Sequence, residues 1–102
     1  MADVDVASDE VSANEVALVA NTVKTVGFAR DLSEVDVANL GGTTTVYVHV
    51  VDPDRPRAAT AAGKHCYPVY VNSTATLPVR TNGNTLLSLI STGASTVWVT
   101  AT

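Results

Sequence analysis

The chain has 102 residues, a formal net charge of −4 at neutral pH and a pI near 4.8, and its length fits one small domain. Nucleic-acid binding depends on Lys and Arg neutralising phosphates, so this charge argues against a nucleic-acid partner. The single cysteine, Cys66, excludes an internal disulfide and a four-cysteine zinc site, which leaves self-association as the expected outside source of stability.

Val and Thr together supply about a third of the residues, whereas charged residues make up only 16%. Both types are β-branched and favour strands over helices. No stretch approaches the ~20 consecutive apolar residues of a membrane span. The start of the chain lacks the basic and apolar regions of a signal peptide. We therefore expect no membrane segment and synthesis in a cytoplasm.

Residues 1–15 are expected to form an acidic, flexible arm, and residues 16–102 a single β domain. The segment is weakly apolar and cannot bury enough surface to offset the entropy of ordering. Two interpretations follow: a solubilising tail, or an arm that orders on a neighbouring subunit. The acidic residues of the segment are Asp3, Asp5, Asp9, Glu10 and Glu15, and it contains no Lys or Arg.

Apolar residues recur at alternate positions from Val16 onward, which is the period of a strand. Glycine turns at Gly41–Gly42, 82–84 and 92–94 separate the runs, and the first is expected to be a two-residue hairpin turn. The pattern predicts an all-β fold, an antiparallel β-sandwich or a small β-barrel. The expected strands are 16–23, 25–28, 34–40, 43–51, 67–72, 75–80, 85–91 and 95–101.

The longest connection runs from Asp52 to Cys66, and its prolines cannot continue a sheet. Arg55, Arg57 and Lys64 place half of the six basic residues here. One hypothesis is that this loop meets the acidic arm of another copy; the alternative is a solvated charged loop.

Only His49 and His65 could act as general bases near neutral pH, and the sequence shows no nucleophile and acid arranged around either. We interpret His49 as an exposed strand histidine. His65 and Cys66 are adjacent, so on an extended chain they point to opposite faces and do not readily share a metal. The sequence therefore predicts no catalytic residue, no metal and no cofactor.

Strand alternation assigns Val46, Val48 and Val50 to the core, together with Val69, Val71, Val97 and Val99. The residues between them, which point to the opposite face of each strand, include Tyr47, His49, Tyr70 and Trp98. Exposed aromatic residues are typical of protein interfaces, so these four are candidate interface residues. The charged candidates are Arg55 and Arg57 of the loop and Asp3, Asp5, Asp9 and Glu10 of the arm. The alternative is that the strands are buried on both faces or that a bulge reverses one parity. In 85–91, Leu86 and Ile90 point to the face opposite that of Leu87 and Leu89. This strand is therefore expected to be covered on both faces.

VGFARDL at 26–32, EVDV at 34–37, a glycine turn and VYV at 46–48 resemble small virion proteins encoded by phages of actinobacteria. LISTGA at 89–94 followed by VWVT at 97–100 looks like the closing hairpin of those proteins. In that family the Tyr strand leads into a loop with Asp, Gly and Pro, whereas here the run from Asp52 to Pro56 has no glycine.

The resemblance implies a capsid decoration protein, also called a cement protein, located on the outer surface of the virion. It implies the major capsid protein as partner and a homo-oligomer, with a trimer favoured by analogy. The alternative is a phage tail or fibre component, or a module that recognises host glycans through Tyr47, Tyr70 and Trp98.

Overall fold

The computed structural model describes residues 4–6, 14–28, 34–42, 44–51, 58–60, 63–79 and 85–101. These residues contain strands and no helix, and hence no helix that could span a membrane. The prediction of an all-β fold is confirmed. The strands are β1 (Val4–Val6), β2 (Asn14–Leu18), β3 (Lys24–Phe28), β4 (Glu34–Asn39), β5 (Val46–Val50), β6 (Tyr67–Val69), β7 (Ser73–Pro78), β8 (Thr85–Ser91) and β9 (Ser95–Ala101).

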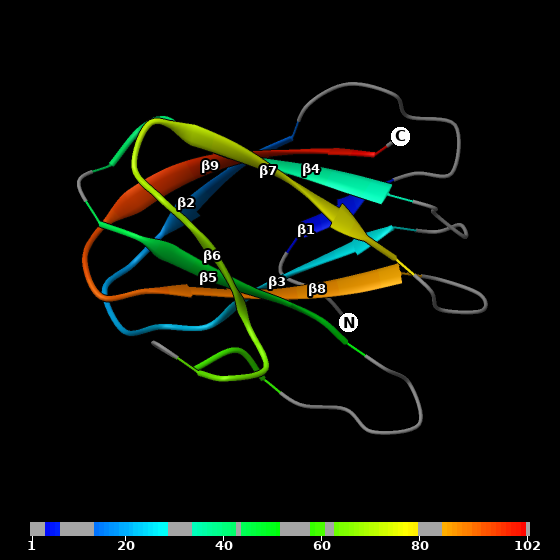
Figure 1. Ribbon diagram of the computed structural model, residues 1–102, viewed down its shortest axis with the longest axis horizontal. Helices are drawn as coiled ribbons and strands as arrows, with labels where there is room; N and C mark the ends of the chain where they lie inside the picture. Colours follow the sequence, from blue (N-terminus) through cyan, green and yellow to red (C-terminus); the bar gives the residue numbers. More distant parts are fainter. Residues whose placement is uncertain are drawn as a thin grey trace.

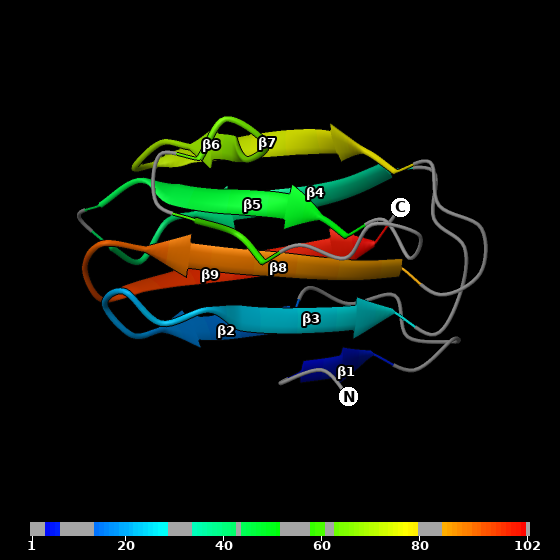
Figure 2. The same ribbon diagram turned by 90° about the horizontal axis from the view of Figure 1, so that it is seen from below.

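The strands form two sheets that pack face to face (Figures 1 and 2). Sheet A has the order β1-β3-β8-β5-β6 and sheet B the order β2-β9-β4-β7. All pairs are antiparallel except β1, which runs parallel to β3. From β2 onward this order is that of a jelly roll, with β1 added at one edge. The predicted antiparallel sandwich is confirmed.

The side chains that point inward from the two sheets fill a shared core, which consists mostly of valine. Val46, Val48, Val69, Val97 and Val99 are buried as predicted, and Val50 packs against this core. Val71 is exposed, contrary to its assignment to the core. The reason is that β6 ends at Val69 and the chain then turns at Asn72, whose φ is 59°, a conformation that asparagine tolerates.

Gly41 and Gly42 do not form a hairpin turn, because β4 belongs to sheet B and β5 to sheet A. Neither glycine adopts the left-handed backbone. Instead, a Cβ on Gly41 would lie 2.9 Å from Cβ of Thr96, and one on Gly42 would lie 2.8 Å from Cα of Ser95. Glycine is required here because the connection passes directly over the start of β9. The turn at 92–94 also joins two sheets, and 82–84 lies outside the described residues.

The acidic segment 1–15 is not wholly separate from the domain. Val4–Val6 forms β1, in register with Val26–Phe28 of β3, and the last two residues of the segment lie in β2. A strand edge offers unpaired backbone groups that an extended segment can satisfy. The rest of 1–15 lies outside the described residues, and the expected boundary stays a prediction.

A buried asparagine ties the two sheets together at the end of the sandwich that carries the 40–45 and 70–72 connections. Asn39 is completely buried in β4 of sheet B. Its Nδ2 donates to the carbonyl oxygens of Thr44 (2.9 Å) and Val69 (3.0 Å). Its Oδ1 accepts from the Ser95 hydroxyl at 2.9 Å. One side chain thus fixes the first residues of β9, the end of β6 and the approach to β5.

We predict that Asn39→Ala lowers the free energy of unfolding by about 3 kcal/mol or more, because two carbonyls and one hydroxyl lose a partner in a buried site. Ser95→Ala removes one of these bonds and is expected to cost about 1 kcal/mol. Chemical denaturation measures the free energy of unfolding of both variants, and Asn39→Ala should be the less stable of the two. Equal losses of unfolding free energy would contradict the proposed hydrogen-bond network around Asn39.

Candidate functional site

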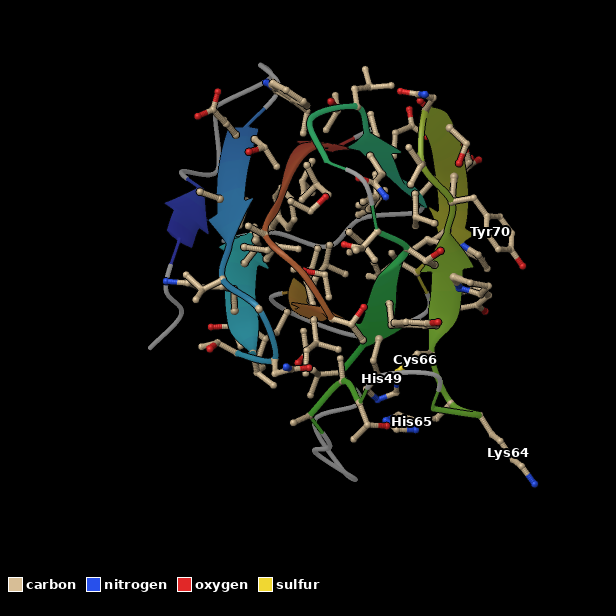
Figure 3. All side chains as sticks on the ribbon, turned by 90° about the vertical axis from the view of Figure 1, so that its left-hand side faces the viewer. His49, Lys64, His65, Cys66 and Tyr70 are labelled. Atoms are coloured by element: carbon tan, nitrogen blue, oxygen red, sulfur yellow. The ribbon has the colours of Figure 1, made fainter. Side chains whose placement is uncertain are left out.

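The four residues predicted to form one interface lie on different surfaces. Tyr47 and His49 are on β5, on the outer face of sheet A, whereas Trp98 is on β9, on the outer face of sheet B. The core lies between the sheets, so these two faces point away from each other. Tyr70 follows β6 and projects from the edge of the sandwich (Figure 3). The structure therefore does not bring the aromatic residues together.

Of the charged residues of the predicted interface, the structure describes only the backbone of Asp5, which pairs with Gly27. Asp5 lies in β1. Asp3, Asp9, Glu10, Arg55 and Arg57 lie outside the described residues.

The outer face of sheet A is partly covered by the chain itself. Ala59, in the connection between β5 and β6, donates its N–H to the hydroxyl of Ser88 on β8 at 2.9 Å. Both residues are almost fully buried, and so is Ile90 on the same face. The predicted burial of 85–91 on both sides is confirmed, and part of the cover comes from this connection.

His49 is half-buried, so its interpretation as an exposed histidine is wrong. Its Nδ1 lies 3.1 Å from the carbonyl oxygen of His65, and Nε2 of His65 lies 2.9 Å from the carbonyl oxygen of Ala58. Carbonyl oxygens only accept hydrogen bonds, so Nδ1 of His49 and Nε2 of His65 each carry a proton. The two rings meet edge to face with centroids 4.8 Å apart (Figure 3). Sequence spacing gives no sign of this contact, because it depends on where a long loop returns.

These contacts give the two histidines a structural role, since they hold the 58–66 connection against sheet A. Among the described residues, no three His, Cys, Asp or Glu side chains lie close enough to hold a metal ion. The expected absence of catalysis and of cofactors remains a prediction.

The outer face of sheet B is centred on Trp98. Its direct cross-strand neighbours are Glu15 on β2 and Ala38 on β4. Thr96 and Thr100 flank it along β9, and all of these side chains are at least partly exposed. The Trp98 side chain is half-buried, so part of it packs on the sheet and part is exposed to solvent. Such an arrangement suits contact with a large partner.

This face is acidic. Among its described residues Glu15, Glu34 and Asp36 are acidic and none is basic. Asp36 also accepts a hydrogen bond from the Thr76 hydroxyl at 2.6 Å, which fixes its carboxylate. The sequence alone missed Glu15 and Asp36 as companions of Trp98. Their proximity depends on β9 pairing with both β2 and β4, which alternation within a strand cannot reveal.

No protein-family model and no curated protein matches the chain. Among solved structures, it is similar to CBM_E1, a carbohydrate-binding module from a sugar cane soil metagenome in complex with cellopentaose, with 10% identity, a TM-score of 0.57 and coverage of 87% of this chain and 84% of that chain. It is similar to PirA, with 13% identity, a TM-score of 0.56 and coverage of 88% and 93%. A periplasmic inhibitor of g-type lysozyme from Aeromonas hydrophila, PliG, has 9% identity, a TM-score of 0.52 and coverage of 97% and 96%. These likenesses show the fold alone.

We predict that Ser88→Ala loosens the 58–66 connection. Ala59 N–H would lose its only described acceptor in a buried site, at a cost of about 1–3 kcal/mol. Amide exchange at Ala59 should accelerate relative to the core strands. Ser73→Ala is the control, because its hydroxyl bonds Tyr70 O in an exposed turn. Unchanged exchange at Ala59 in the Ser88 variant would contradict this role.

Proposed function

We propose that the protein is a bacteriophage capsid decoration protein that binds the outer surface of the major capsid shell through the outer face of sheet B. The observation that supports this most is the position of Trp98, partly exposed on a regular sheet and surrounded by threonine, alanine and carboxylate side chains. Tryptophan residues at the centre of an interface often contribute most of its binding free energy.

The neighbours of Trp98 are suited to a protein interface. Alanine and threonine lose little side-chain entropy on binding compared with long side chains. They are also attached to paired strands, which hold them in place before the partner arrives. A surface of this kind can bind without rearrangement.

The acidic residues of the face indicate the chemistry of the partner. Glu15 and Asp36 lie on either side of the Trp98 strand, so a shell surface with Lys or Arg around an apolar site would be complementary. Such contacts weaken with added salt because the charges are screened.

The proposed role is mechanical and involves no reaction. A copy that contacts two adjacent capsid subunits binds the assembled shell better than the separated subunits. Binding then stabilises the shell by mass action.

We predict that Trp98→Ala weakens binding to assembled shells of the source phage by about 30-fold or more, as expected for a central tryptophan. Tyr47→Ala is the matched control, because this half-buried aromatic residue lies on the opposite outer face. Its affinity should equal that of the wild type. Co-sedimentation with shells measures both variants, and thermal unfolding verifies that each remains folded.

Decoration should also raise the temperature at which the shells disrupt. Failure of the wild-type protein to bind expanded shells would contradict the proposal. Equal losses of shell affinity in the Trp98 and Tyr47 variants would show that sheet B is not the docking face.

A second candidate function is recognition of host glycans, which the carboxylates around Trp98 favour, because sugar sites combine aromatic faces with acidic hydrogen-bond acceptors. Trp98 is the only tryptophan, so its fluorescence reports directly on this site. If the site binds sugar, titration with neutral oligosaccharides such as cellopentaose should shift the emission, and added salt should matter little. No shift with any glycan would count against this function, whereas decoration would be unaffected by that result.

A further inference from the structure

A carboxylate on the outer face of sheet B is held in place by a neighbouring hydroxyl. Asp36 of β4 pairs across the strands with Thr76 on β7 and with Thr100 on β9. The Thr76 hydroxyl donates to Oδ1 of Asp36 at 2.6 Å, and both side chains are at least partly exposed. A surface carboxylate that is already oriented loses less side-chain entropy when it binds a cation.

The register of β4 and β9 places this carboxylate beside Trp98. Trp98 is directly opposite Ala38, and Asp36 lies two positions from Ala38 on the same face of β4. Asp36 and Trp98 are therefore diagonal neighbours, whose positions on a sheet are about 7–8 Å apart, a separation that a long side chain can reach across. Ala38 is partly exposed, and its single methyl group fills little of the space between them.

The chemistry of this pair favours a planar cation. An indole ring attracts a cation placed over its face, and a carboxylate binds a guanidinium through two parallel hydrogen bonds. The bond from Thr76 uses one of about four acceptor positions of the Asp36 carboxylate. Arginine can make both contacts at once, because its guanidinium stacks on an aromatic ring and donates hydrogen bonds in its own plane. The ammonium group of lysine is a compact, strongly hydrated charge.

The charge of the surroundings fits the same occupant. Glu15 of β2 is directly opposite Trp98 on its other side, so carboxylates are present on both strands next to β9. The basic residues that the structure describes lie elsewhere, since Lys24 is in β3 of sheet A and Lys64 precedes β6. An arginine presented by a partner would therefore complement the described part of this face.

We propose that Trp98 and Asp36 form a binding site for an arginine side chain of a protein partner, with Thr76 as the residue that positions the carboxylate. The guanidinium stacks on the indole and pairs with Asp36. The identity of the partner as the capsid shell rests on the proposed function, whereas the site and its preference for arginine over lysine belong to the isolated protein.

Titration of the isolated protein with two short peptides tests the site. The probes are acetyl-Gly-Arg-Gly-amide and acetyl-Gly-Lys-Gly-amide, and the emission of Trp98, the only tryptophan, reports their binding. The arginine peptide should bind about 3-fold more tightly or better, because only arginine stacks and pairs bidentately at once. Asp36→Asn should weaken binding of the arginine peptide about 10-fold and abolish the preference.

Two threonines of β7 separate the positioning role of Thr76 from a general effect of the strand. Thr76→Val removes the hydroxyl that orients Asp36 and should reduce the preference for arginine, whereas Thr76→Ser keeps a hydroxyl and should restore it. Thr74→Val is the matched control, because Thr74 is also exposed but pairs with Ala38. It should bind both peptides as the wild type does. Thermal unfolding verifies that each variant is folded.

Equal binding of the two peptides by the wild-type protein would overturn the proposal, and so would an Asp36→Asn variant that keeps the preference. A Thr74→Val variant as impaired as Thr76→Val would overturn the role of Thr76. Shell binding is a separate measurement. Protein that prefers arginine but does not bind shells would keep the site and contradict capsid decoration, whereas shell binding without this preference would contradict the site alone.

Discussion

The shared core between the two sheets is the constraint on which the rest of the structure depends. Successive side chains of a strand point to opposite faces, so packing one parity of both sheets into a common interior sends the other parity to two surfaces that face apart. Tyr47 and Trp98 are both outward residues, yet they cannot contact one compact partner surface together. Packing of the core thus places Tyr47 on the outer face of sheet A and Trp98 on the outer face of sheet B.

The surfaces left by this division differ in character. Sheet A has part of its outer face covered, because Ala59 bonds Ser88 and the two histidines hold the same connection. The described part of sheet B keeps a face of Trp98, threonines and carboxylates. The sandwich therefore has one outer face partly covered by its own chain and another whose described side chains include exposed carboxylates around Trp98.

The sequence was sufficient to predict the fold class, most strands and the core parity, because valine alternation is a local signal. It could not predict which strands pair. Gly41 and Gly42 resemble a hairpin turn in sequence, but the chain crosses there to the other sheet, and the glycines are needed for close approach to Ser95 and Thr96. The burial of His49 likewise depends on the return of a distant loop. The acidic neighbours of Trp98 became visible only with the register of β2 and β4.

Electron cryo-microscopy of decorated shells tests the central claim most directly, since it shows the orientation of every bound copy. If the proposed function is correct, the outer face of sheet B, with Trp98, lies against the shell in every bound copy. Bound copies with Trp98 facing solvent, or with sheet A against the shell, would contradict it.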